Sequence, residues 1–227
     1  MNPEPMKKSF RQWTIADLEK FLGLKKTVKM PELIEWTSAS NAPVPRELEA
    51  AVERLRTNLE LNFDVWNEMD LRTMFIGPII SLVHFQGEGF SSFSNRTISA
   101  IVGEYEIFGE ADWMVATGRA EPESPFFFLH EYKRDSPEGS EPMAQLLAAM
   151  SVARVRNGGE HPVYGCLVSG CIWRFVLLCD KRYGVSVSYD AADPTELPAI
   201  WSILSETKNR IVARVAQLQS SAMQTRL

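Results

Sequence analysis

The change of hydrophobic period along residues 97–190 constrains the fold more than any other feature of the sequence. Three short runs rich in β-branched and aromatic residues come first, with turn residues at Gly109 and in the loop GRAEPESP: TISAIVGEYEIFG, ADWMVATG and PFFFLHEYK. A helical segment, EPMAQLLAAMSVARVRN, precedes three further extended runs: PVYGCLVSG, IWRFVLLCD and YGVSVSYD. Short β-branched runs predict strands, while apolar spacing near 3.6 residues predicts a helix. This order predicts an antiparallel three-strand meander, a crossover helix and a return to the same sheet.

Helical segments flank the predicted strands on both sides. TIADLEKFLG begins at a Thr14 cap and ends at Gly23, and MPELIEW follows as a second short helix. RELEAAVERLRTNLELN carries one apolar face, Pro78 is expected to kink WNEMDLRTMFIGPIISLVHF, and the last segment is an amphipathic helix. We therefore predict an α/β fold with a mixed central sheet flanked by helices. Its expected parts are an N-terminal helical extension (1–44) and one larger domain (45–227).

Composition and cysteine usage indicate the compartment. No window approaches 18 uninterrupted apolar residues, so no membrane span is expected, and the first residues lack the apolar region of a secretory signal. The three cysteines, Cys166, Cys171 and Cys179, match no zinc spacing, and an odd number in an apolar stretch is typical of reduced thiols. We expect an intracellular protein, cytoplasmic or, in a eukaryote, nuclear.

The net charge of −5 argues against a strong stand-alone nucleic-acid binder. Such binders normally carry a basic face, because neutralising phosphates dominates their affinity. A local basic patch on an acidic protein is still compatible with this charge.

Two charged residues end the apolar strand PFFFLHEYKR. Strand alternation places Glu131 and Lys133 on one face, about 6–7 Å apart, and His130 and Tyr132 on the other. A buried charge is costly unless it has a partner or a metal. Asp112 leads into the neighbouring apolar run, and antiparallel pairing can bring it next to Glu131. His130, which faces away from Glu131, is better explained as a core histidine.

Two carboxylates and a lysine at one end of a sheet suit hard-cation chemistry. Mg²⁺ and Mn²⁺ prefer carboxylate oxygens, usually with water and substrate phosphate completing the coordination. A bound cation lowers the pKa of a water and polarises phosphorus, while a lysine can orient that water or stabilise developing charge. These groups are sufficient for phosphodiester hydrolysis.

The arrangement of Asp112 followed 19 positions later by Glu131-Tyr132-Lys133 resembles the PD-(D/E)XK nuclease superfamily. The signature is an aspartate at the start of one strand and (D/E)-x-K on the next. The resemblance implies a restriction-endonuclease-like αβββαβ core over residues 65–169, metal binding by Asp112 and Glu131, and catalysis by these two with Lys133. The chain departs from the signature at Ala111, which stands where the family has a proline.

The resemblance extends to the flanking helices. Glu68 precedes the meander where the family has a helix glutamate that completes the metal site, and Gln145 follows it where several branches place a glutamine beside the site. Arg134 is the arginine best placed to contact a nucleic-acid backbone. The alternatives are a solvated helix face for Glu68, near Asp64 and Asp70, and an exposed helix position for Gln145.

Two functions remain open from the sequence. The first is a Mg²⁺- or Mn²⁺-dependent nuclease acting on DNA or RNA. The second is a catalytically silent binding module with the nuclease fold, whose N-terminal helices provide a partner surface or a homodimer contact. The acidic charge favours the second, whereas the intact aspartate, glutamate and lysine favour the first.

Overall fold

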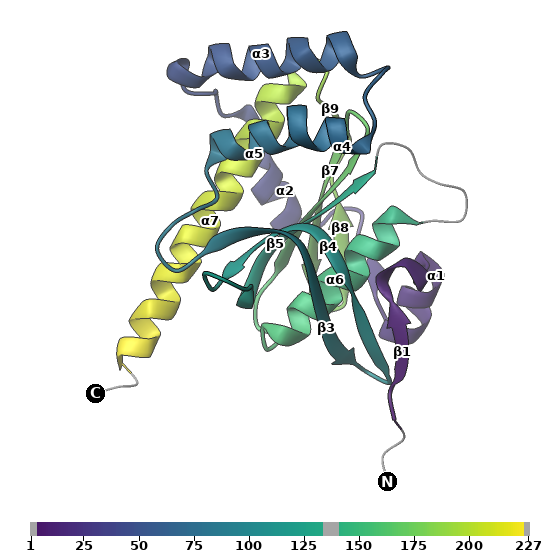
Figure 1. The fold of residues 1–227 in the computed structure, drawn as a ribbon. Coiled ribbons are helices and arrows are strands. Elements are labelled where there is room, and N and C mark those ends of the chain that lie inside the picture. The colour runs from purple at the N-terminus through teal and green to yellow at the C-terminus, as the bar shows by residue number, and fades with distance from the viewer. Residues whose placement is uncertain (1–3, 134–140, 225–227) are drawn as a thin grey trace.

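The computed structural model describes residues 4–133 and 141–224, without the side chains of 222–224. A mixed β-sheet with helices on both faces forms its centre (Figure 1), which confirms the predicted α/β fold class. The predicted antiparallel meander is present as β3 (Ser91–Val102), β4 (Tyr105–Thr117) and β5 (Glu123–Lys133).

Helix α6 (Pro142–Arg156) connects the meander to β6 (Val163–Ser169), which lies parallel to β5. The sheet continues in antiparallel fashion through β7 (Ile172–Cys179) to β8 (Arg182–Val185), while β9 (Tyr189–Asp190) also pairs with β7. The sequence therefore predicted correctly that the chain returns to the same sheet after a crossover helix.

The N-terminal region adds two strands that the sequence did not predict. β1 (Met6–Ser9) lies parallel to β4, and β2 (Lys25–Lys26) lies parallel to β8. Both are short and rich in lysine, so neither shows the apolar alternation that indicates a strand. The domain boundary after residue 44 stays a prediction, although this region supplies strands to the same sheet.

The first hairpin turns at Gly103, whereas the sequence placed a turn at Gly109. Gly103 has a left-handed φ of 63° and joins β3 to β4. Gly109 lies inside β4 opposite Ile98, and a Cβ there would come within 2.4 Å of the Phe10 ring. Gly109 is thus required for close packing of the N-terminal region against the strand, and not for a turn.

Most of the predicted helices are present. Thr14 accepts a hydrogen bond from the Asp17 amide at the start of the first helix, and Gly23 ends its π-helical continuation with a φ of 70°. The helix around Pro78 widens to π geometry just before the proline and then continues, because proline cannot donate the normal backbone bond. The bounds are α1 (Ile15–Asp17), η2 (Leu18–Leu22), α2 (Pro31–Thr37), η3 (Ser38–Asn41), α3 (Arg46–Asn62), α4 (Glu68–Leu71), η4 (Arg72–Ile76), α5 (Gly77–Val83) and α7 (Glu196–Gln224).

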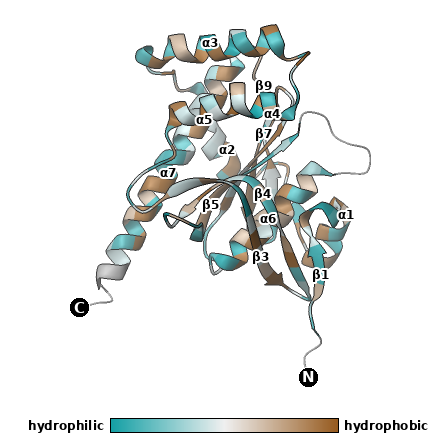
Figure 2. Cartoon of the chain, in the orientation of Figure 1, coloured by the Kyte–Doolittle hydropathy of each residue, from teal (hydrophilic) through white to brown (hydrophobic). Residues whose placement is uncertain are grey.

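The sheet separates two hydrophobic cores. One contains Leu129 and Leu167 from the strands and is covered by α6 and the N-terminal turn η1 (Phe10–Gln12). The other contains Phe128 and Trp173 and is covered by α2, α5 and α7. Figure 2 shows hydrophobic stretches in the central strands, a hydrophilic β1, and an α3 that alternates between hydrophobic and hydrophilic residues along its length. Within the part of the chain that the structure describes, no helix combines the length and apolar character needed to cross a membrane.

Candidate active site

The site forms where β4 and β5 separate. Their regular pairing ends at Trp113 and His130, and the next residue, Asp112, accepts a hydrogen bond from the Tyr132 amide through its carboxylate (2.7 Å). Asn95, opposite Asp112 in β3, adopts a left-handed φ of 51°. β5 meanwhile stays paired with β6 as far as Lys133. The Asp112 side chain therefore takes the place of a strand partner, which holds it at a defined position.

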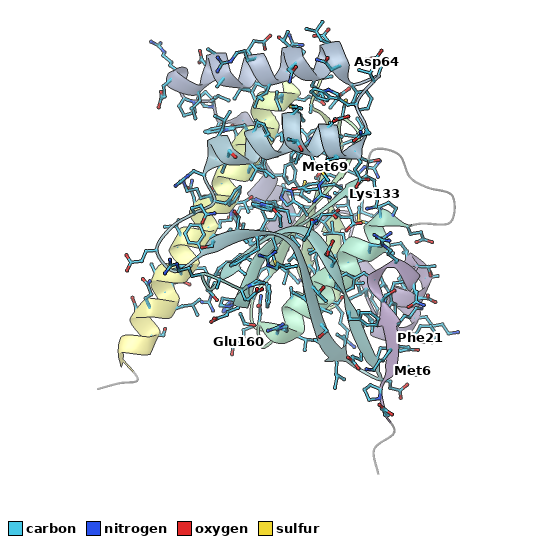
Figure 3. All side chains as sticks on the ribbon, in the orientation of Figure 1. Met6, Phe21, Asp64, Met69, Lys133 and Glu160 are labelled. Atoms are coloured by element: carbon cyan, nitrogen blue, oxygen red, sulfur yellow. The ribbon has the colours of Figure 1, made fainter. Side chains whose placement is uncertain are left out.

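Lys133 lies beside both carboxylates. Its Nζ is 2.9 Å from Glu131 Oε1 and 4.0 Å from Asp112 Oδ2, and it donates a hydrogen bond to the Tyr132 carbonyl (2.8 Å). The three charged side chains are only 9–16% exposed. The structure thus brings Asp112, Glu131 and Lys133 together as the sequence predicted. Lys133 is labelled in Figure 3.

Glu131 has a strongly altered acidity. Burial, and secondarily the charge of Asp112, raise the pKa of its carboxyl from 4.5 to about 7, although Lys133 and Arg11 act to lower it. A carboxyl in a cleft with a pKa near neutrality is typical of functional sites. Glu131 can therefore exchange a proton, or accept a cation in its place, at physiological pH.

Arg72 was not identified from the sequence. Its guanidinium lies 3.6 Å from the Asp112 carboxylate, donates to Asn95 Oδ1 (2.8 Å) and stacks 5.3 Å from the Tyr132 ring centre. It stands one helical turn after Glu68, so the i, i+4 spacing was the signal that could have identified it. Arg11 in η1 was also missed, because nothing local links the N-terminal region to β5.

Glu68 does not join the other two carboxylates. It is the first residue of α4, half-buried, and Arg72 one turn later is the side chain of this helix that reaches Asp112. Among the described residues, no group of three histidine, cysteine, aspartate or glutamate side chains is placed to hold a metal ion. A contribution of Glu68 to metal binding stays a prediction.

The remaining predicted residues have different environments. Gln145 is buried on α6, where it is 4% exposed, so the alternative of a solvent-exposed glutamine does not hold. Arg134 lies outside the described residues. His130 is buried on the opposite face from Glu131, and its Nδ1 pairs with the Tyr132 hydroxyl (2.9 Å). Burial lowers the pKa of His130 to about 3, which makes it a neutral core histidine.

A cavity of about 470 Å³ lies between α4–α5 and strands β3–β4. Asp112, Tyr132 and Arg72 line it, together with Asn95 and Trp113. A second cavity of about 380 Å³ lies on the other face of the sheet, at the start of α6, and contains Leu167, Ser169 and Arg174. The strand register aligns Glu131 with Leu167 and Arg174 across the sheet. Asp112 therefore borders the first cavity, and Glu131 is aligned in the sheet with residues that line the second.

The donor set fits a hard divalent cation. Asp112 and Glu131 offer carboxylate oxygens close enough for the charge of one to raise the pKa of the other. A cation between them would relieve this repulsion and favour the ionised form of Glu131, because metal binding requires deprotonated ligands. Lys133, which now contacts Glu131, would be free to turn toward a substrate.

Comparison with known proteins adds no relative. The sequence matches no protein-family model and none of the curated proteins with which it was compared. What the site can do chemically is therefore inferred from its residues and their geometry alone.

Proposed function

We propose that the chain is a Mg²⁺- or Mn²⁺-dependent nuclease of the PD-(D/E)XK type. The observation that carries this proposal is the cluster of Asp112, Glu131 and Lys133 at the separation of β4 and β5. The order α5–β3–β4–β5–α6–β6, with β6 parallel to β5, supports a restriction-endonuclease-like αβββαβ core.

The chain's own residues have distinct roles in this proposal. Asp112 and Glu131 hold the cation, which when bound lowers the pKa of a water and polarises the phosphorus centre. Lys133 orients or deprotonates the attacking water and stabilises negative charge that develops on the phosphate. Arg72 keeps Asp112 in position, and Glu68 assists through a water. Gln145 supports the site from α6, and Arg134 contacts the substrate backbone.

The proposed substrate is DNA or RNA. The overall charge is unfavourable, but Arg11, Arg72 and Lys133 lie at or act on the acidic pair, and Arg174 lines the neighbouring cavity. Such a local basic set supports binding of a phosphate backbone. Intracellular location and homodimer formation stay predictions.

A specific observation favours the catalytically silent alternative. Arg72 and Lys133 already neutralise Asp112 and Glu131, so the cluster is compensated without a metal. The presence of these buried charges therefore does not by itself require a bound cation. The two functions then differ only in whether a cation displaces the ammonium of Lys133 from Glu131.

A cleavage assay distinguishes these functions. The purified chain is incubated with supercoiled plasmid, single-stranded DNA and RNA, in Mn²⁺ and in EDTA. The nuclease proposal predicts Mn²⁺-dependent cleavage that is lost in the double variant Asp112→Asn, Glu131→Gln, which preserves side-chain volume. Glu110→Gln, an exposed carboxylate on the same strand, is the matched control and should cleave normally. Equal activity of the double variant, or none in the wild type, contradicts the proposal.

A further inference from the structure

We propose that a separate cavity, at the opposite end of β5 from Lys133, binds a small molecule carrying a planar ring and a phosphate, such as a nucleoside monophosphate. The cavity of about 430 Å³ lies between the start of β5, the end of α6 and the C-terminal half of α7. Its size falls in the usual range for small-molecule sites. Figure 3 labels Glu160, one of its lining residues, far from Lys133.

The cavity concentrates positive charge on an acidic protein. Three arginines line it, Arg156, Arg210 and Arg214, against a net charge of −5 for the chain. Arg210 is paired with Glu35 and Glu206. Within residues 4–133 and 141–224, neither Arg156 nor Arg214 forms an ion pair. The charges of these two guanidiniums are therefore uncompensated, although Arg214 also donates to Gln217 Oε1 (3.2 Å). Their planar donor pattern is well suited to an anion.

Arg214 and His161 form the polar centre of the cavity. The guanidinium of Arg214 contacts His161 Nε2, and its buried Nε has no hydrogen-bond partner among the described residues. Burial, and secondarily the charge of Arg214, lower the pKa of His161, so the imidazole accepts a hydrogen bond in its neutral form. A phosphate between the two groups would offset the positive charge of Arg214, so that His161 could take up a proton and donate to the phosphate as well. Glu160, a carboxylate that also lines the cavity, is exposed and lies 3.8 Å from His161.

The other wall of the cavity is apolar and fixed in place. The guanidinium of Arg156 stacks 4.9 Å from the centre of the Phe126 ring. Asn157 bonds both the amide and the carbonyl of Phe126, each at 2.7 Å, which joins the end of α6 to the start of β5. Pro125, Phe127, Pro162, Ile211 and Leu218 complete this wall. The cavity therefore combines a preformed apolar wall with guanidiniums that form no ion pair. This combination suits a ring that carries a phosphate, whereas a free phosphate would leave the apolar wall unused.

Calorimetry with the full chain tests this proposal. The titrations are made in EDTA, so that the acidic site contributes no metal-dependent binding, with 5′-AMP, adenosine and inorganic phosphate as probes. We expect 5′-AMP to bind at least about tenfold more tightly than adenosine or inorganic phosphate, because it contacts both the arginines and the apolar wall. A 5′-phosphorylated oligonucleotide, titrated in parallel, distinguishes a strand end from a free nucleotide as the source of the phosphate.

Variants and a second measurement distinguish a loss of binding from a loss of folding. Arg214→Gln and Arg156→Gln should each weaken 5′-AMP binding by about tenfold or more, whereas the exposed Arg54→Gln on α3 should not change it. In NMR titrations, addition of 5′-AMP should raise the pKa of His161 and leave that of the buried His130 unchanged. Binding no tighter than that of inorganic phosphate, an unaffected Arg214→Gln variant, or an unchanged His161 would each overturn the proposal.

Discussion

The last residues of β5 differ sharply between the two faces of the sheet. Glu131 and Lys133 face the side covered by α6, where Lys133 forms ion pairs with Glu131 and with Asp112. His130 and Tyr132 face the other side, where they form a hydrogen-bonded pair among Trp113 and other rings. Glu131, His130 and Tyr132 are all less than 10% exposed, so burial alone does not separate the faces.

The same physical cause acts on both faces with opposite signs. Burial raises the pKa of Glu131 to about 7 and lowers that of His130 to about 3, favouring the neutral form in each case. His130 is then neutral throughout the physiological range. Glu131 instead titrates near pH 7 beside a second carboxylate and a lysine. The presence of charged partners, and not the degree of burial, therefore distinguishes the candidate site from the core.

The largest expected effect is that of Lys133→Ala on cleavage. The rate with Mn²⁺ should fall by about 100- to 10,000-fold, the usual contribution of a proton-transferring side chain. The melting temperature should change little, because Glu131 can take up a proton when its partner is lost. Lys29→Ala, an exposed lysine, is the control. Normal cleavage by Lys133→Ala would exclude this mechanism.

Glu131 should give a metal-free protein an unusual pH dependence. The pKa of the Glu131 carboxyl is about 7 in the folded protein, against an ordinary value of 4.5. The stability that this carboxyl contributes is therefore fully present below pH 4.5 and is lost as pH rises through 7. The loss in free energy of unfolding is about 3 kcal/mol at most, from the difference of about 2.5 pKa units. Urea unfolding in EDTA at pH 5–8 should show this loss of stability in the wild type and in the control Glu110→Gln, but not in Glu131→Gln. Parallel profiles for wild type and Glu131→Gln would contradict it.

Asp112→Asn should weaken Mn²⁺ binding by about tenfold or more, measured by calorimetry at pH 8. The asparagine carbonyl can still accept the hydrogen bond from the Tyr132 amide, so the variant removes the charge with little change in the strand geometry. Unchanged Mn²⁺ affinity would rule out Asp112 as a ligand.

The hydroxyl of Tyr132 should affect stability and not cleavage. Tyr132→Phe removes the hydroxyl that pairs with His130 and should lower the free energy of unfolding by about 1 kcal/mol. Its cleavage rate should stay within about threefold of the wild type, since the tyrosine backbone and not its hydroxyl contacts Asp112. A large loss of cleavage without a loss of stability would mean that the two faces are not functionally separate.

The sequence predicted the parts of this site that depend on local pattern. Alternation along β5 correctly separated Glu131 and Lys133 from His130, and strand order brought Asp112 close to Glu131. The turn at Gly103 was missed because Gly109 offered an equally good local signal, and only Phe10, distant in sequence, explains that glycine. Arg72 has a local signal in its i, i+4 spacing from Glu68, but its partners Asp112 and Asn95 lie on strands distant in sequence.

The N-terminal strands depend on long-range pairing in the same way. β1 and β2 have lysine-rich sequences without apolar alternation. They form strands because they pair in parallel with β4 and β8. Arg11 then acts on Glu131 through this packing. Contacts between distant segments therefore account for most of what the sequence did not predict.

The most direct test of the account is a crystal structure grown at pH 8 with Mn²⁺, using the anomalous scattering of manganese. We expect an anomalous peak bonded to both Asp112 and Glu131, with the ammonium of Lys133 moved away from Glu131. Crystals of Asp112→Asn should lack that peak. A wild-type structure in saturating Mn²⁺ that keeps the 2.9 Å contact between Lys133 and Glu131, with no manganese between the carboxylates, would rule out a metal site at these residues.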